Sequence, residues 1–243
     1  MDGIGREFIE RTKYKYLRMS DQAKNLPQPP LELEAESDKK IIVLPQPKNV
    51  NVNIKLVEAM ENRRSLRRYS DKPLTLEELS FLLWCTQGVR QRYHNVTFRM
   101  VPSAGARHAF ETYILANNVY GLNTGLYRYL ALEHKLQEVI ISTEITDKLV
   151  EACLGQTFII NSAVTFIWVA VAYRMTWRYG ERGYRYMFLD AGHVAQNLYL
   201  AAEGIGCGTC VIGAYDDDAV NRLLGIDGKE QFAIYLAAVG KKI

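Results

Sequence analysis

A short run between Arg63 and Tyr69, RRSLRRY, contains four arginines and one serine. Planar guanidinium groups match phosphate oxygens through two parallel hydrogen bonds, and the Ser65 hydroxyl can donate another. One phosphate needs about two such cations, which leaves the others for a carbonyl-rich ligand. A solvated basic turn accounts for the composition equally well. The run alone therefore leaves an anion site and a surface turn as alternatives.

A second run joins the small residues Pro102-Ser103-Ala104-Gly105-Ala106 to Arg107 and His108. Small side chains let backbone N–H groups approach a flat or anionic ligand closely. An ordinary loop has the same composition, and the loop interpretation is favoured when the run is taken alone.

The segment Gly204–Gly213 is rich in glycine, but it follows a predicted helix and enters a predicted strand. A dinucleotide fingerprint needs the reverse order. The segment contains Cys207 and Cys210, spaced as CxxC. A reactive dithiol normally places its first cysteine at a helix N-terminus, and a closed zinc site needs four ligands. Because neither condition is met, we interpret both cysteines as small buried residues and expect no metal site.

Arginines and tyrosines interleave between Tyr173 and Tyr186. This pattern fits a substrate or flavin pocket, a nucleic-acid strand bound by charge and stacking, or a structural crossing loop. The balanced charge of the whole chain weakens the nucleic-acid alternative. Further on, Asp190 and His193 stand three residues apart. Such groups more often cap a helix start or satisfy buried polar neighbours than act in catalysis.

The chain of 243 residues is 48% hydrophobic and 23% charged, with a net charge of +3, which is ordinary for a globular protein. Four cysteines are too few for a disulfide-stapled secreted module. The N-terminus has no apolar signal-peptide core, and the longest apolar run, Ala163–Ala172, is shorter than the about 20 residues of a membrane span. We therefore expect a cytoplasmic protein without membrane or nucleic-acid partners.

Residues 1–49 differ in composition from the rest. Five of the seven prolines lie there, between Pro27 and Pro47, and proline favours extended backbone. We expect an arm that lies over the domain surface, with a candidate helix in Gly5–Met19 and an apolar stretch at Ile41–Leu44 that needs cover. The globular domain is expected at residues 50–243.

Apolar periodicity and turn residues predict the elements of the domain. Helices are expected at 53–62 with Asn53 as N-cap, from Thr75 onward with a capping box, and at 148–154, 189–203 and 217–224, with Gly204 at the C′ position after 189–203. Strands are expected at 110–116, 125–129 in a hairpin with 134–139, 163–172, 209–212 and 232–239. The apolar stretch 163–172 should be central and buried on both faces. Because strands and helices do not alternate cleanly, the order predicts an α+β fold.

Taken in order, these motifs resemble the nitroreductase superfamily, in its SagB/ThcOx-type dehydrogenase branch. The matching segments run from about residue 50 to the end: RRSLRRY, PLTLEEL at 73–79, PSAGARH at 102–108, GLYRY at 125–129, RGYRY at 182–186, DAGHVAQN at 190–197, YDD at 215–217 and AVG at 238–240. The resemblance implies a nitroreductase-like three-layer α-β-α sandwich with a mixed central sheet. It also implies an interlocked homodimer with two FMN sites at the interface.

The resemblance further implies which residues bind the cofactor. The arginine–serine run would hold the phosphate and the pyrimidine edge of FMN, and the small-residue run would line the flavin from the partner chain. Backbone N–H groups at the end of the predicted strand 209–212 would face flavin N5 and O4, and a C-terminal lysine would add a phosphate contact. The residues concerned are Arg63, Arg64, Ser65, Arg67, Pro102, Ser103, Ala104, Gly105, Ile212, Gly213, Ala214 and Lys241.

The implied activity is that of an FMN-dependent oxidoreductase, with ping-pong hydride transfer through flavin N5 from NAD(P)H to a small nitroaromatic, quinone or enone-like acceptor. Azoline dehydrogenation of a modified peptide is one alternative, and a non-catalytic flavin-binding sensor or carrier is another. Azoline oxidases of the branch have a Lys-Tyr pair where this chain has Arg178-Tyr179, the candidate catalytic residues. Arginine does not give up its proton as a desolvated lysine can, but Tyr179 can still move one.

Overall fold

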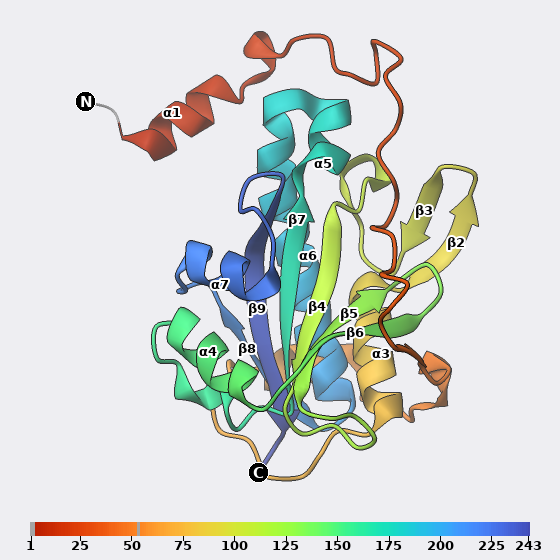
Figure 1. Cartoon of the computed structure of the whole chain (residues 1–243), viewed down its shortest axis with the longest axis vertical. Helices are drawn as coiled ribbons and strands as arrows, with labels where there is room; N and C mark the ends of the chain where they lie inside the picture. Colours follow the sequence, from red (N-terminus) through yellow and green to blue (C-terminus); the bar gives the residue numbers. More distant parts are fainter. Residues whose placement is uncertain (1–2, 53) are drawn as a thin grey trace.

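A seven-stranded sheet forms the centre of the computed structural model, which describes residues 3–52 and 54–243. The strand order is β1-β6-β5-β4-β7-β9-β8 (Figure 1), and β2 and β3 form a separate hairpin. The strands are β1 Ile41–Val43, β2 Val89–Tyr93, β3 Val96–Arg99, β4 Phe110–Ala116, β5 Gly125–Leu130, β6 Lys135–Ile141, β7 Val164–Val171, β8 Cys207–Ile212 and β9 Gln231–Lys241. The α-helices are α1 Ile4–Arg11, α2 Leu56–Asn62, α3 Leu76–Gln87, α4 Glu144–Ala152, α5 Ala172–Tyr179, α6 Gly183–Gly204 and α7 Asp217–Leu224.

The sheet is mainly antiparallel. Each paired set of named strands runs in opposite directions, and β7 lies between β4 and β9. Residues 164–170 of β7 are buried, so the prediction of a central strand buried on both faces is confirmed. The parallel component of the expected mixed sheet is limited, in the described part of the chain, to two isolated bridges, Ser65–Thr209 and Leu74–Val119.

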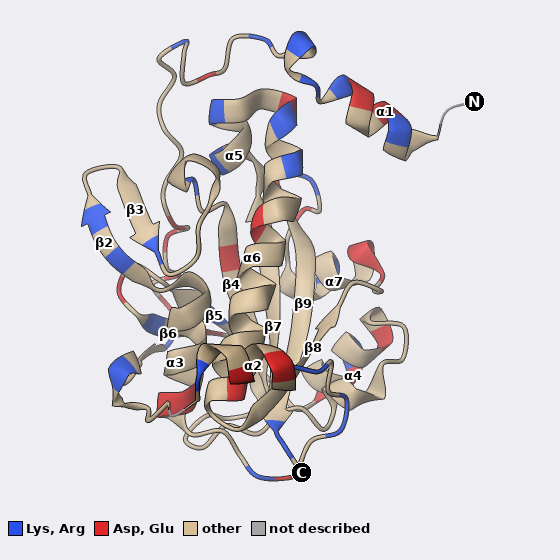
Figure 2. Cartoon of the chain, turned by 180° about the vertical axis from the view of Figure 1, so that it is seen from behind, with Lys and Arg blue, Asp and Glu red and all other residues tan. Residues whose placement is uncertain are grey.

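Helices cover both faces of the sheet, which confirms the three-layer α-β-α architecture. Alternate residues of a strand face opposite sides, and β7 follows this rule. Phe166 and Trp168 lie in the core under α3 and α6, whereas Ile167 and Val169 lie in the core under α4 and α7. Figure 2 views the side covered by α2, α3 and α6, and Figure 1 views the side with α4 and α7.

Several predicted element boundaries agree with the structure. The helix α3 begins with the expected capping box, in which Thr75 and Glu78 bond each other's backbone N–H. The helix α7 has the predicted bounds, and the hairpin of β5 and β6 joins the predicted segments. The predicted N-cap of α2, Asn53, lies outside the described residues, and the prediction is wrong because α2 begins at Leu56 with Lys55 as its N-cap.

Other boundaries differ. The helix α6 begins at Gly183, six residues before the prediction, because its first turns carry arginine and tyrosine instead of an apolar stripe. The placement of Gly204 at a C′ position is wrong, since Gly204 is still helical and the positive φ of 68° belongs to Gly206. Packing explains the glycine at 204, where a Cβ would lie 2.9 Å from Val52 Cγ1. The helix α4 begins four residues earlier than predicted.

The N-terminal segment follows an extended course from α1 to β1 (Figure 1). The strand β1 pairs with the edge of β6, but the apolar stretch predicted to need cover is buried only in part: Leu44 is 4% exposed, whereas Ile41 and Val43 are 39% and 70% exposed. Three buried arginines of the domain donate to backbone carbonyls of this segment. Arg174 Nε donates to Pro30 at 2.8 Å, Arg128 Nη2 to Glu34 at 2.7 Å and Arg99 Nη2 to Leu31 at 3.3 Å.

One buried ion pair lies where the N-terminal segment contacts the domain. Arg174 Nη2 lies 2.5 Å from Glu111 Oε1, and each side chain is only 2% exposed. The same carboxylate oxygen accepts the Leu33 N–H at 2.8 Å, so it joins the N-terminal segment to β4 and α5. Each buried charge is stabilised by its partner, because water cannot solvate the remaining charge when the partner is removed.

We predict that Glu111→Ala lowers the free energy of unfolding by about 3–5 kcal/mol, because it leaves the Arg174 cation buried without an anion. Urea unfolding would measure the change. The control is Lys148→Ala, which removes the partner of Glu144 from an exposed pair on α4 and should change stability by less than about 1 kcal/mol. Similar losses in the two variants would contradict the prediction.

Candidate active site

The arginine–serine run lies along the edge strand β8. Leu66 N donates to Thr209 O at 2.9 Å, and Ser65 forms a parallel bridge with Thr209. This approach requires a glycine at 208, because a Cβ there would lie 2.3 Å from Leu66 Cδ2. Tyr69 then fixes the end of the run by donating its hydroxyl to Leu66 O at 2.6 Å. The apolar members of the run thus attach it to the sheet.

The polar members of the run face away from the core. Arg63 is partly exposed, and Arg64, Arg67 and Arg68 are exposed. The Arg63 guanidinium lies over the Tyr199 ring, 5.2 Å from its centroid, and that of Arg67 lies 5.9 Å from the Phe158 centroid. Within residues 3–52 and 54–243, none of the four guanidiniums has a carboxylate within 4.0 Å. Four uncompensated cations in six residues favour an anionic ligand.

The turn after β8 follows directly on the strand that the run contacts. Ile212 is buried, whereas Gly213 and Ala214 are exposed. Ala214 O accepts Gln156 Nε2 at 2.7 Å, which fixes the turn. The turn predicted to face flavin N5 is therefore exposed, and the hydrogen bond from Gln156 fixes its position.

Lys241 has a carboxylate partner in this chain. Its ammonium group is paired with Glu78 and lies 3.4 Å from Ile205 O, and its side chain is 18% exposed. Lys242 is paired with Glu203 in the same way. The charge of Lys241 is thus compensated, unlike the charges of the arginine–serine run.

The small-residue run sits on α6. Ser103 Oγ donates to Asp190 Oδ2 at 2.6 Å, Ala104 N lies 3.3 Å from the same carboxylate, and His108 N donates to Ser103 Oγ at 2.9 Å. Burial raises the pKa of Asp190, while these donors oppose the shift. Asp190 therefore satisfies buried polar neighbours, as predicted. It does not cap a helix start, because α6 begins seven residues earlier.

Arg178 and Tyr179 meet this run at Gly105. A Cβ on Gly105 would lie 2.4 Å from the Tyr179 hydroxyl and 3.1 Å from Arg178 Nε, so both side chains rest against the glycine. Gly105 has a φ of +56°, while Pro102 is exposed at the start of the run. The segment 173–179 is helical in α5, not a crossing loop, and basic residues gather there and at the start of α6 (Figure 2).

The predicted site residues thus form two groups on one chain. The first, with Ser65 and the β8 turn, contacts α6 at Tyr199, and the second, with Ser103 and Gly105, contacts α6 at Asp190. The two contact residues of α6 are nine positions apart, which is roughly 14 Å along the axis. Tyr199, Phe158 and Gln156 were not among the predicted residues. A phenol within the alanine-rich helix 189–203 was the one sequence signal for Tyr199.

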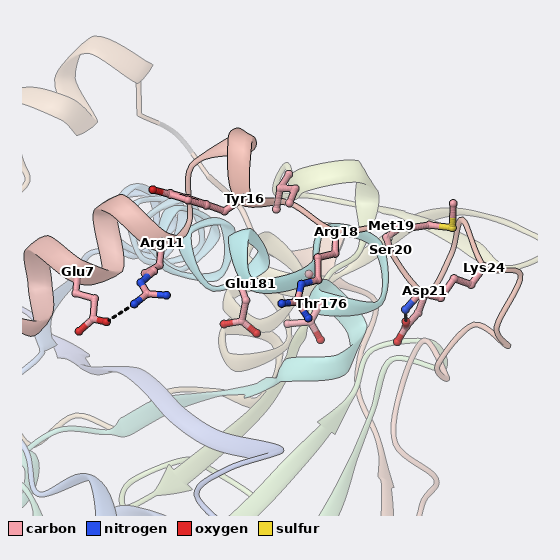
Figure 3. A pocket seen from close by; sticks show the side chains of 12 residues that line it. Glu7, Arg11, Tyr16, Arg18, Met19, Ser20, Asp21, Lys24, Thr176 and Glu181 are labelled. Carbon is pink, nitrogen blue, oxygen red and sulfur yellow. Dashed lines mark hydrogen bonds and ion pairs between the residues drawn. The ribbon is translucent and has the colours of Figure 1, made fainter.

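A pocket of about 720 Å³ lies between the N-terminal segment and α5 (Figure 3). It contains none of the predicted site residues. Its charged lining has both signs, so it does not select an anion: Glu7, Arg11, Arg18, Asp21, Lys24 and Glu181.

The CxxC cysteines are buried, as predicted, with 0% and 1% of Cys207 and Cys210 exposed. Burial raises the pKa of Cys207 to about 12, so its thiol is a poor nucleophile at neutral pH. Among residues 3–52 and 54–243, no group of three or more His, Cys, Asp or Glu side chains is arranged to hold a metal ion. Within the same residues, every helix is too short or too polar to cross a membrane.

A sequence model of the nitroreductase family matches residues 60–241. The chain belongs to the nitroreductase family. The inferred nitroreductase MJ1384 of Methanocaldococcus jannaschii is 38% identical over 190 residues, covering 78% of this chain and 92% of that protein. The microcin B17-processing protein McbC of Escherichia coli is 27% identical over 135 residues, covering 53% of this chain and 49% of McbC.

Solved structures agree. An inferred nitroreductase from Anabaena variabilis has 29% identity and a TM-score of 0.68, covering 85% of this chain and 42% of that one. One from Desulfovibrio desulfuricans in complex with FMN has 16% identity and a TM-score of 0.55, covering 78% and 87%, and shows the fold alone. These matches confirm the family and the fold predicted from the sequence. They also confirm the predicted enzyme class, which is an FMN-dependent oxidoreductase. The oligomeric state, the electron donor and the acceptor stay predictions.

We predict that Gly105→Ala lowers stability through two effects, a positive φ that costs about 1–2 kcal/mol and a clash with the Tyr179 hydroxyl. Tyr179→Phe removes that hydroxyl and should restore part of the loss in the Gly105→Ala background, as measured by urea unfolding. Gly121→Ala is the control, because Gly121 has a φ of +84° with nothing within 4 Å of a Cβ. A rescue of equal size in the Gly121→Ala background would argue against contact between Gly105 and Tyr179.

Proposed function

We propose that this chain works as a homodimer that passes hydride from NAD(P)H, through FMN, to a small acceptor such as a quinone, nitroaromatic or enone. The observation that carries the proposal is the run of four arginines, which has no carboxylate partner among the described residues and lies along β8, the strand that leads into the exposed turn. This donor set fits a ligand with a phosphate at one end and carbonyl groups at the other.

The residues of this chain have distinct roles in the proposal. Arg63, Arg64 and Ser65 bind the phosphate, and Arg67 provides a fixed cation for the pyrimidine edge. Backbone N–H groups of Gly213 and Ala214 orient the reactive edge of the ring system. FMN supplies the two-electron chemistry when bound, and the protein supplies binding, orientation and electrostatics. Lys241 would contact the phosphate only if its ammonium group left Glu78.

The proposed dimer explains the separation of the two groups on α6. A symmetric partner can bring its small-residue run, Pro102–Gly105, to the arginine–serine run of the first chain. Exposed apolar side chains on α2 and α6 support the proposed dimer, since large apolar patches on a protein surface mark interaction sites. Their exposed fractions are 61% for Leu56, 66% for Val57, 53% for Met60, 56% for Phe188 and 61% for Leu189.

The pair Arg178-Tyr179 favours a small acceptor over an azoline peptide. An arginine stays charged in proteins, so Arg178 can bind a developing negative charge but cannot take a proton from a substrate carbon. Tyr179 can donate or accept one proton, and its hydroxyl faces Gly105 in the run that lines the proposed flavin site. This combination suits an acceptor that gains hydride and then a proton.

We predict that the purified protein binds FMN at about one per chain, seen as oxidised-flavin absorption bands. Arg63→Ala and Ser65→Ala should each weaken FMN binding by about 10- to 100-fold, because each removes a hydrogen bond to a charged group. Riboflavin, which lacks the phosphate, should bind wild type and both variants alike. The control is Arg92→Ala, an exposed arginine on β2. Unchanged FMN affinity in the Arg63 and Ser65 variants would remove the phosphate assignment.

Azoline dehydrogenation is the second candidate, favoured by the similarity to McbC, which processes microcin B17. Two assays together separate the candidates. We predict that NADH or NADPH reduces the bound flavin and that a quinone or nitroaromatic reoxidises it over many turnovers. A thiazoline peptide that loses two hydrogens, detected by mass, would favour the second candidate. Flavin that neither nicotinamide donors nor these substrates reduce would favour a non-catalytic sensor or carrier.

A further inference from the structure

Tyr199 of α6 joins the two segments that would hold the cofactor on one chain. Its hydroxyl lies 3.0 Å from Ser65 Oγ and accepts the Val211 N–H at 3.2 Å. Tyr199 is 8% exposed, and the Arg63 guanidinium lies 5.2 Å from the centroid of its ring. Val211 is followed directly by the turn of Ile212–Ala214. One side chain therefore contacts the arginine–serine run by its ring and hydroxyl, and β8 by its hydroxyl.

The donors and acceptors around the Tyr199 hydroxyl favour one direction for its hydrogen bond with Ser65. A phenolic hydroxyl has one hydrogen to donate, and one of its lone pairs is taken by the Val211 N–H. Ser65 Oγ, at 3.0 Å, is the other hydrogen-bond partner of this hydroxyl among the described residues and can accept that hydrogen. When Tyr199 donates to Ser65, the serine's own hydrogen is left free. A free serine O–H at an exposed position next to three arginines points to an anionic oxygen.

We propose that Tyr199 is a positioning residue for the phosphate site. It donates to Ser65 and so directs the Ser65 hydroxyl hydrogen toward the phosphate of FMN, while its ring fixes the Arg63 guanidinium. The proposal rests on the proposed function, because the phosphate of FMN is the anion in question. A purely structural tyrosine would fill the same space without affecting one ligand more than another.

The test compares FMN with riboflavin. Tyr199→Phe retains the ring, its packing and the contact with Arg63, and removes only the hydroxyl. We expect FMN to dissociate from this variant with a constant raised on the order of 10-fold, while riboflavin binds as in wild type. Tyr127→Phe is the matched control, since it removes a hydroxyl that donates to Asn123 O at 2.8 Å on the distant strand β5. It should bind both ligands normally.

A double-mutant cycle tests the route through Ser65. Ser65 is exposed, so Ser65→Ala leaves the fold intact and serves as the second variant. If Tyr199 acts through Ser65, the double variant binds FMN no more weakly than the weaker single variant. Additive losses, an equal loss of riboflavin, or an unchanged FMN affinity in Tyr199→Phe would each overturn the proposal. A wild type that binds neither flavin would overturn the proposed function as well, which separates the two failures.

Discussion

The candidate site depends on keeping several cations close together without neutralising them. Like charges repel, so a run such as Arg63–Arg68 stays ordered only if its backbone is fixed by contacts that do not use the guanidinium groups. The structure meets this condition through Leu66, which lies on Gly208 of β8, and Tyr69, which bonds back to Leu66. These contacts fix the run without a carboxylate among the described residues, although the Arg64 guanidinium also donates to Glu61 O at 2.6 Å and to Arg63 O at 2.9 Å.

The helix α6 determines how the rest of the site is arranged. It supports the small-residue run through Asp190 and the arginine–serine run through Tyr199, with most of three helical turns between them. A rigid helix cannot shorten this distance. In the proposed dimer, a second chain would bring its own small-residue run to the arginine–serine run of the first chain.

The sequence predicted those parts of the fold whose signal is local. An unbroken apolar run predicted β7, a capping box predicted α3, and the resemblance predicted the family. The start of α6 was missed because Tyr184 and Tyr186 bury their rings on one side while Arg182 and Arg185 contact the N-terminal segment, so no apolar stripe is visible. The role of Gly208 also escaped prediction, because it depends on Leu66, which is about 140 residues away in the chain. Contacts of this kind follow from tertiary packing, not from periodicity.

The substitution of arginine for lysine before Tyr179 bears on the class of acceptor. Removing a proton from carbon requires an unprotonated base near the substrate, and a guanidinium remains protonated at any accessible pH. Reducing a carbonyl-conjugated or nitro acceptor requires the opposite, a cation that stabilises the incoming negative charge and a weak acid that completes the reaction. Arg178 and Tyr179 provide this pair of properties side by side at Gly105. The chemistry of the two side chains therefore favours a reductase, even though the similarity to peptide-processing relatives extends over half of the chain.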